Sequence, residues 1–248
     1  MRYFLPLTFL WVITSLSSVF AAPIVGGDKD AHGCIGSAGY SYSETLQKCI
    51  RPWELYNIDR EQIITGNARL DALLKRKWDA ITSSFQNNAE LLIREISREF
   101  DYSGSLHYEL QIHPVLIQTG SIISMAMETY TYLGGAHGSA VVYTWNYDTK
   151  KNKLLFLPNV LNRKELQTVA KNIEQYLVDT LWAGADKEWI QEWLSPKKLS
   201  NYATFTVHTD KSGKIETITF YFADYQVWPH AIGMPVVTID KKTLSVKK

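Results

Sequence analysis

The spacing of apolar residues changes from a helical to an alternating period near residue 106, and this change constrains the fold more than any other feature of the sequence. Apolar side chains recur every three or four residues from Leu70 to Phe85. A second such stripe follows Asn87-Asn88 and runs from Ala89 to Phe100. Both stripes predict helices with one buried face.

Beyond that point the pattern becomes that of strands. Apolar and polar side chains alternate from Leu106 to His113, which predicts a half-buried strand, and Pro114 either ends this strand or marks an edge of the sheet. Further strands are predicted over residues 121–132, 140–147, 154–157, 203–208 and 214–222, with hairpin turns at 148–152 and 210–213.

An amphipathic stripe from Leu166 to Leu181 predicts another helix, and a shorter helix is predicted between Trp182 and Leu194. The order is therefore helices, strands, a helix and strands. This order predicts an α+β fold, with a mostly antiparallel sheet packed against amphipathic helices.

The N-terminus has the pattern of an export signal. Arg2 precedes an apolar run from Phe4 to Leu16, and small residues lead to a cleavage site after Ala21. The run is shorter than the roughly 20 residues that span a bilayer, and no later stretch is apolar enough to do so. We expect residues 1–21 to be removed and the product to be periplasmic or secreted; an uncleaved anchor is the alternative.

The charge pattern argues against a nucleic-acid partner. The sequence has 26 basic and 25 acidic residues, and the expected cleavage removes one arginine and no acid. The short basic runs at 75–77, 150–151 and 197–198 are interleaved with acidic residues and are interpreted as solvated faces.

Residues 22–56 differ from the rest in being rich in glycine and serine and in holding the only two cysteines, Cys34 and Cys49. In an oxidising compartment these two are expected to form a disulfide, with free thiols as the alternative. The sequence thus predicts a small disulfide-stapled module, followed by a main domain over residues 57–248.

Two motifs in the main domain carry a family resemblance. The segment 121–138, SIISMAMETYTYLGGAHG, and the later stretch 222–233, FADYQVWPHAIG, contain the sequences GGAHG and YxVxPxxxG. In this order the chain resembles the periplasmic domain of RsiV-type anti-sigma factors and PdaC-type peptidoglycan deacetylases over roughly residues 57–248. The preceding module resembles a cysteine-containing segment of exported bacterial proteins with the pattern GGDxDxHGC.

The resemblance points to the two motif loops as a binding surface. In the first loop Gly134 and Gly135 permit a turn that places His137 beyond a strand end, next to Tyr130 and Tyr132. The alternative is a tight connection in which His137 only hydrogen-bonds local carbonyl groups.

In the second loop, Trp228 and His230 are the residues expected to meet a ligand. Asp224 and Tyr225 complete the predicted binding residues. For Tyr225, Pro229 and Gly233 the favoured interpretation is structural: an aromatic strand that turns at Trp228-Pro229 and packs on the core.

No catalytic residues, cofactor or metal site are predicted. The sequence lacks GxSxG and HExxH, and His107 and His113 would lie about 20 Å apart along a strand. Asp28, Asp30 and His32 alternate as in a calcium loop, but Gly39 stands where the closing glutamate is needed. In PdaC-type proteins the deacetylase activity belongs to a separate domain whose motifs are absent here.

The expected function is therefore that of an exported, non-catalytic binding domain of the bacterial cell envelope. The resemblance implies a lysozyme-like protein or a cell-wall glycan as its partner. The alternative is an enzyme that acts on peptidoglycan or another polysaccharide, with His137, Asp224 and His230 as its first candidates. A purely structural envelope protein without a ligand is a third interpretation.

Overall fold

The computed structural model describes residues 28–99, 107–180, 198–227 and 233–247, together with Glu188, Glu192, Leu194 and His230. Its elements are, in order, η1 (Gly36–Ala38), β1 (Ser41–Ser43), β2 (Lys48–Ile50), α1 (Pro52–Leu55), β3 (Tyr56–Arg60), α2 (Ala68–Glu99), β4 (Tyr108–Thr119), β5 (Ile122–Tyr132), β6 (Ser139–Asp148), β7 (Lys153–Leu154), α3 (Leu157–Val160), α4 (Arg163–Thr180), η2 (Leu199–Tyr202), β8 (Phe205–Thr209), β9 (Ile215–Tyr221) and β10 (Val236–Asp240). The predicted signal peptide and most of the predicted 182–194 helix lie outside the described residues. None of the described helices is long and apolar enough to cross a membrane.

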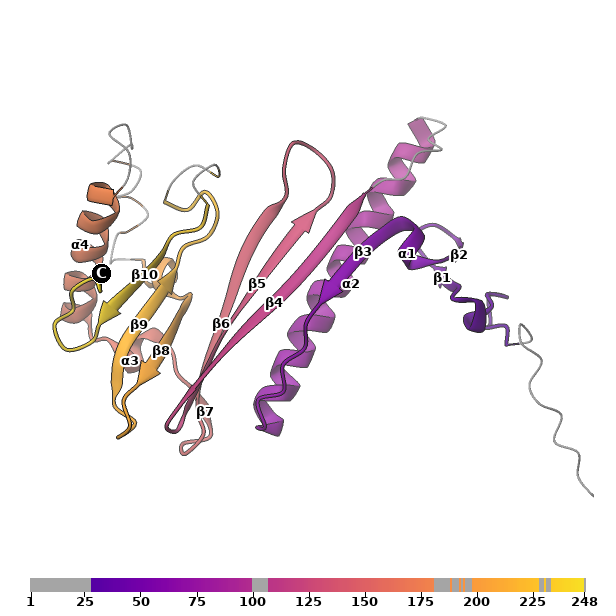
Figure 1. The fold of residues 1–248 in the computed structure, drawn as a ribbon. Coiled ribbons are helices and arrows are strands. Elements are labelled where there is room, and N and C mark those ends of the chain that lie inside the picture. Colours follow the sequence, from indigo (N-terminus) through magenta and orange to yellow (C-terminus); the bar gives the residue numbers. More distant parts are fainter. Residues whose placement is uncertain are drawn as a thin grey trace, which may run out of the picture.

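Strands β3 to β7 form a five-stranded sheet in sequence order. β4, β5, β6 and β7 pair antiparallel through hairpins, whereas β3 pairs parallel with β4. The parallel pair follows from the connection, because the chain passes through the long helix α2 and returns in the same direction (Figure 1).

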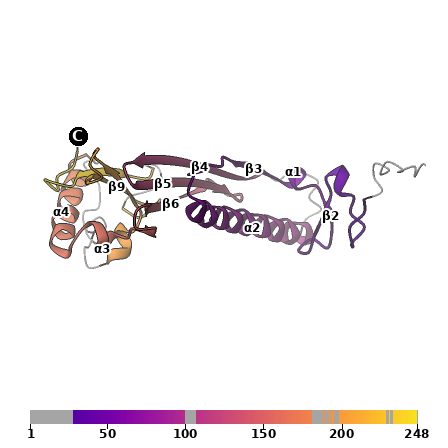
Figure 2. The same ribbon diagram turned by 90° about the horizontal axis from the view of Figure 1, so that it is seen from below.

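Strands β8, β9 and β10 form a second, fully antiparallel sheet in the order β10-β9-β8. The α+β class and the dominance of antiparallel pairing are thus confirmed. The division into two sheets was not predicted. Figure 2 shows α2 and α4 on the same side of the strands, each beneath its own sheet.

Each helix buries the face that its apolar stripe predicted. On α2 the buried side chains include Leu70, Leu74, Trp78 and Phe85, which pack with residues of β4 and β5. On α4 the buried side chains are Leu166, Val169, Ala170, Ile173 and Leu177, which pack with residues of β8, β9 and β10. The described chain therefore has two hydrophobic cores, one per sheet.

Polar side chains of the first sheet supply hydrogen-bond partners to the backbone of β8, at the edge of the second sheet that does not pair with β9. Asn146 in β6 donates to the Phe205 carbonyl of β8 at 2.8 Å and accepts from Val207 N–H at 3.0 Å. Ser124 in β5 donates to the Val207 carbonyl at 2.8 Å, and Thr144 accepts from Phe205 N–H at 3.0 Å. We call this set of contacts the sheet joint.

Three details of the helices and strands correct the predictions. The two helical stripes form one continuous helix, because Asn87 and Asn88 lie on the exposed face of α2 and do not interrupt its buried stripe. The strand predicted over 154–157 is reduced to β7, since Leu157 begins α3 and Pro158 suits a first helical turn. The short strands β3 and β10 were missed.

Pro114 does not end its strand, because β4 continues to Thr119. Instead it marks an edge, the other role predicted for it. β3 ends at Arg60, which pairs with Ile112, so beyond that point β4 has β5 as its neighbour in the sheet. A residue without N–H is tolerated there.

Cys34 and Cys49 form a disulfide in the N-terminal segment, as predicted. The bridge joins the turn region that precedes η1 to strand β2, which pairs with β1 in a small hairpin. Asp30 accepts hydrogen bonds from the N–H groups of His32 and Cys34, both at 2.9 Å, and these bonds hold the turn.

Candidate functional site

The loop between β5 and β6 is shaped by two glycines. Gly134 and Gly135 both have φ of 90°, a conformation that side chains rarely adopt. The hydroxyl of Tyr132 donates to the Gly135 carbonyl at 3.0 Å and closes the turn. The ring of Tyr130 lies where a Cβ on Gly138 would be, with its Cζ 2.4 Å from that position. Tyr130 and Tyr132 thus shape the loop that carries His137.

The hydrogen bonds of His137 fix which of its ring nitrogens carries the proton. Nδ1 lies 2.9 Å from the carbonyl of Gly138, which can only accept, so Nδ1 donates. In the neutral ring Nε2 is then an acceptor. It lies 3.1 Å from the hydroxyl of Tyr225, which supplies the hydrogen. The competing interpretation, a bond to a local carbonyl, is correct for Nδ1, while Nε2 reaches the second motif.

The second motif meets the first through its histidine. The rings of His137 and His230 are stacked, with centroids 4.0 Å apart and planes 17° from parallel. His230 also stacks with Tyr225 at 5.7 Å. We call His137, Asp224, Tyr225 and His230 the histidine cluster. All four were predicted from the sequence as binding residues, and the structure brings them together.

Asp224 orients His230. Its Oδ2 lies 2.5 Å from His230 Nδ1, and the side chain is only 8% exposed. The other oxygen, Oδ1, is buried and has no hydrogen-bond partner among the described residues. Nδ1 of His230 is therefore taken by the carboxylate, whereas no described residue bonds its Nε2 atom.

The backbone conformation and the exposure of Tyr225 were not predicted from the sequence. Its φ is 61°, and its side chain is 45% exposed, so the proposed packing of its ring on the core is wrong. With the backbone in this left-handed conformation, the Tyr225 side chain is exposed and its hydroxyl contacts His137. Phe222, by contrast, is the aromatic residue of this stretch that enters the core.

The remaining predicted binding residue, Trp228, lies outside the described residues. Chemically, the cluster offers stacked rings, a phenol hydroxyl and a carboxylate-oriented imidazole. No serine, threonine or cysteine bonds any of its four side chains within the described part of the chain. No group of three described His, Cys, Asp or Glu side chains is placed to hold a metal ion.

Comparisons with known proteins find similarity to the DUF3298 family and to a peptidoglycan deacetylase. Residues 153–242 match the family DUF3298, which is described as a protein of unknown function. Over 180 residues the chain is 27% identical to the peptidoglycan-N-acetylmuramic acid deacetylase PdaC of Bacillus subtilis (strain 168). This match covers 72% of the present chain but only 36% of the deacetylase.

Two crystal structures of DUF3298 proteins are also similar. The protein from Bacteroides fragilis NCTC 9343 has a TM-score of 0.49 at 16% identity, with 73% of this chain and 70% of that chain covered. The protein from Pseudomonas aeruginosa PAO1 has a TM-score of 0.37 at 18% identity, with 61% and 67% covered. The similarity to a PdaC-type protein that the motifs indicated is found in the sequence match to the Bacillus subtilis deacetylase, at low identity.

Proposed function

We propose that this chain is an exported, non-catalytic domain that binds cell-wall glycan of the peptidoglycan type through the histidine cluster. The observation that carries the proposal is the contact between the two motif loops, in which His137 of one loop stacks on His230 of the other. Loops held by a rigid scaffold are where recognition is usually found.

The chemistry of the cluster suits a saccharide. Sugar rings present hydroxyl groups and apolar C–H faces, and protein sites match these with polar side chains and aromatic rings. Here the exposed ring of Tyr225 offers a face, and Nε2 of His230 offers a hydrogen-bonding position fixed by Asp224. The name of the relative from Bacillus subtilis supports peptidoglycan as the glycan.

Export is supported by the N-terminal pattern and by the disulfide. A Cys34–Cys49 bridge is compatible with an oxidising compartment outside the cytosol. We therefore propose that residues 1–21 are a signal peptide, and that residues 22–56 and 57–248 are the small module and the main domain of a periplasmic or secreted protein.

One observation favours a second candidate, a hydrolase or deacetylase. A carboxylate that orients a histidine through Nδ1 is the arrangement of a general base, and Asp224 and His230 have it. Beside the base, such chemistry uses a second acid, a nucleophile or a set of metal ligands, and the histidine cluster contains a single carboxylate, that of Asp224. Binding is for this reason the function we propose first.

The test is cosedimentation of the full chain with purified insoluble peptidoglycan. The variants His137→Ala and Tyr225→Phe remove one ring and one hydroxyl of the cluster, and Trp228→Ala removes the remaining predicted contact. We expect the affinity to fall roughly tenfold or more for His137→Ala, with its melting temperature little changed. The control His113→Ala changes an exposed histidine of β4 and should bind normally.

Three results would point elsewhere. Equal binding by wild type and His137→Ala, with a sharply lower melting temperature for the variant, would make the loops structural. Capture of lysozyme but not of peptidoglycan would make a protein the partner. Release of acetate or reducing sugar from peptidoglycan, abolished in Asp224→Asn, would establish the enzyme instead.

A further inference from the structure

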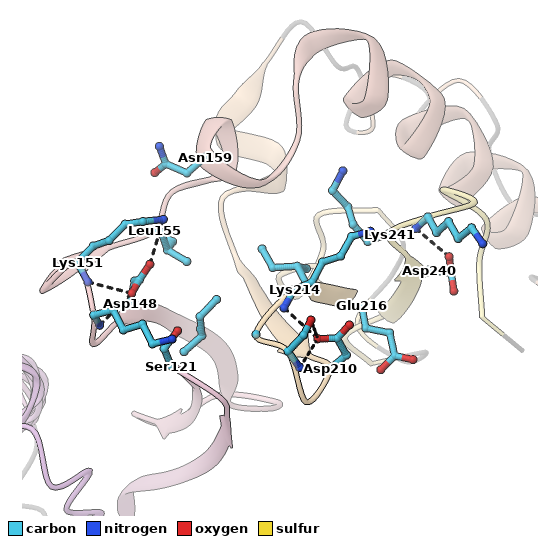
Figure 3. Close-up of a pocket in the computed structure, with 16 residues that line it drawn as sticks. Ser121, Asp148, Lys151, Leu155, Asn159, Asp210, Lys214, Glu216, Asp240 and Lys241 are labelled. Carbon is cyan, nitrogen blue, oxygen red and sulfur yellow. Dashed lines mark hydrogen bonds and ion pairs between the residues drawn. The ribbon is translucent and has the colours of Figure 1, made fainter.

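A cavity of about 800 Å³ lies between the two sheets at the end opposite to the histidine cluster. Ser121 and Asp148, at the ends of β5 and β6, line one side, and Asp210 and Lys214, in the β8–β9 turn, line the other (Figure 3). Lys241 and Lys242, just after β10, complete the wall. A cavity of this volume accommodates a small molecule of several rings.

The floor of the cavity is apolar and the rim is charged. Ile122, Leu155 and Ile215 are partly or fully buried and belong to or pack against the core of the second sheet. The rim carries lysines from three separate turns, in a protein whose formal net charge is only +1. The lining also contains four acidic residues, Asp148, Asp210, Glu216 and Asp240, so the charge available to a ligand depends on how these acids are used.

The aspartates of these turns accept hydrogen bonds from backbone N–H groups of the same turn. Asp148 accepts from the N–H groups of Lys150 and Lys151, each at 3.0 Å. Asp210 accepts from Ser212 N–H at 2.8 Å and from Lys214 N–H at 3.0 Å. Burial raises the pKa of Asp148, but the bonds from Lys151 and Lys150 outweigh burial and lower it. The Ser212 hydroxyl and the Lys214 N–H lower the pKa of Asp210. Both carboxylates therefore stay ionised and hold their own turns.

Asp240 repeats the arrangement after β10. Its Oδ1 accepts from the N–H groups of Lys242 and Thr243, both at 2.9 Å. Three turns from different parts of the chain thus share one design, in which an aspartate holds the backbone and a lysine beside it extends from the turn.

Two of the five lysines at the cavity have acidic partners. Lys151 Nζ lies 3.3 Å from Asp148, and Lys241 Nζ bonds Glu165. The ammonium groups of Lys150, Lys214 and Lys242 have no acidic partner among the described residues. Glu216 also lines the cavity, and its Oε2 lies 3.7 Å from Nδ1 of His208.

We infer that this cavity is a second binding site, for a ligand of about two or three sugar rings in size that carries carboxylate or phosphate groups. Lys150, Lys214 and Lys242 come from three separate turns that line the cavity, and a concave wall of low dielectric concentrates the field of such cations. The apolar floor receives the uncharged body of the ligand. Carboxylate and phosphate oxygens are both acceptors for lysine, so the site recognises the oxyanion group that they share.

This site is independent of the proposed glycan contact at the histidine cluster. Ile122 lies at the cavity and Tyr132 lies at the β5–β6 loop, so the length of β5 separates the two. At about 3.3 Å per residue this is roughly 33 Å. One site can therefore fail its test without affecting the other.

Titration calorimetry on the full chain tests the inference with three probes. Trigalacturonate carries carboxylates, inorganic triphosphate carries phosphates, and chitotriose is an uncharged saccharide of similar size. We expect at least one anionic probe to bind, chitotriose not to bind at this site, and the affinity to fall with added salt. The probe that binds more tightly distinguishes a carboxylate source from a phosphate source.

Two matched variants assign the binding to the cavity. Lys214→Gln removes an ammonium group from the lining, whereas Lys211→Gln removes one from the same turn outside it. We expect Lys214→Gln to weaken anion binding roughly three- to tenfold and Lys211→Gln to leave it unchanged. Failure of both anions to bind, or equal losses in the two variants, would overturn the inference.

Discussion

Glu165 joins the first turn of α4 to the end of β10. Its Oε2 accepts from Asn162 N–H at 2.8 Å, and the Asn162 side chain accepts from Glu165 N–H at 3.0 Å, a reciprocal capping box. Lys241 donates to its other oxygen. The lysine bond and the Asn162 N–H bond lower the pKa of this carboxyl group below its ordinary value of 4.5.

A lowered carboxyl pKa stabilises the fold above the ordinary value, and that contribution is lost as the pH falls through the folded-state pKa. We expect Glu165→Gln to reduce the free energy of unfolding by about 1 kcal/mol at neutral pH. The difference from wild type should shrink at pH values below 4.5. Urea unfolding across this range measures it. Glu95→Gln, on the exposed face of α2, serves as the control, and a difference independent of pH would contradict the argument.

Sequence motifs identified the residues of the candidate site, but not their geometry. His137 and His230 are 93 residues apart, and nothing in either motif indicates that their rings stack. Their contact depends on the packing of the two sheets, which brings the β5–β6 loop to the loop after β9. The outward turn of Tyr225 depends on a positive φ that its residue type does not suggest.

Among the elements, β8 is the strand whose hydrogen bonds are completed from outside its own sheet. One edge pairs with β9, and the other receives side chains of Ser124, Thr144 and Asn146. Asn146 and Ser124 are 3% and 0% exposed, so water cannot replace them. The sheet joint thus links the two hydrophobic cores through buried polar groups.

We expect Asn146→Ala to lower the free energy of unfolding by about 2–4 kcal/mol, because it leaves Phe205 C=O and Val207 N–H buried without these partners. Urea denaturation followed by circular dichroism gives the value. Asn57→Ala, at an exposed position of β3, should change stability by less than about 0.5 kcal/mol. Similar small effects for both variants would show that the joint contributes little.

Long periodic elements were predictable from the sequence and short ones were not. α2 and α4 each carry a buried stripe over many turns, and β4 to β6 are each ten or more residues long. β3 and β10 have five residues each, too few for a period to be distinguished from chance. Where the two sheets meet, Ser124 and Asn146 bond the backbone of β8, and in the sequence these two are ordinary polar residues of strands.

At the scale of the whole molecule, the N-terminal segment is attached to α2 by a buried carboxylate. Ser43 of β1 donates to Glu90 at 2.5 Å, and the hydroxyl of Tyr56 donates to the same carboxylate at 3.3 Å. Burial and the nearby Glu90 raise the pKa of Tyr56 to about 12, so the phenol stays a donor at neutral pH. The hairpin and the main sheet therefore both bond the Glu90 carboxylate, and Leu46 of the hairpin also packs against the core of the first sheet.

The disulfide should stabilise this segment and not the main cores. Replacing Cys34 and Cys49 with alanine removes a constraint on a loop of 15 residues, worth about 3 kcal/mol in the chain-entropy model. We expect the variant to lose protection from proteolysis before residue 56 while its far-UV helix signal persists. Intact mass after alkylation should show two free thiols only once the wild type is reduced. A collapse of the helix signal in the variant would mean that the segments fold as one unit.

The sheet joint also bears on the order of folding. Its hydrogen bonds connect residues 59 to 83 positions apart, whereas each hairpin joins close neighbours in sequence. Loop closure over such separations is slow, so the hairpins form first and the joint closes late. Until it closes, the free edge of β8 is a template for pairing with another chain. Refolding at high protein concentration therefore risks aggregation through β8, an edge that the finished fold conceals.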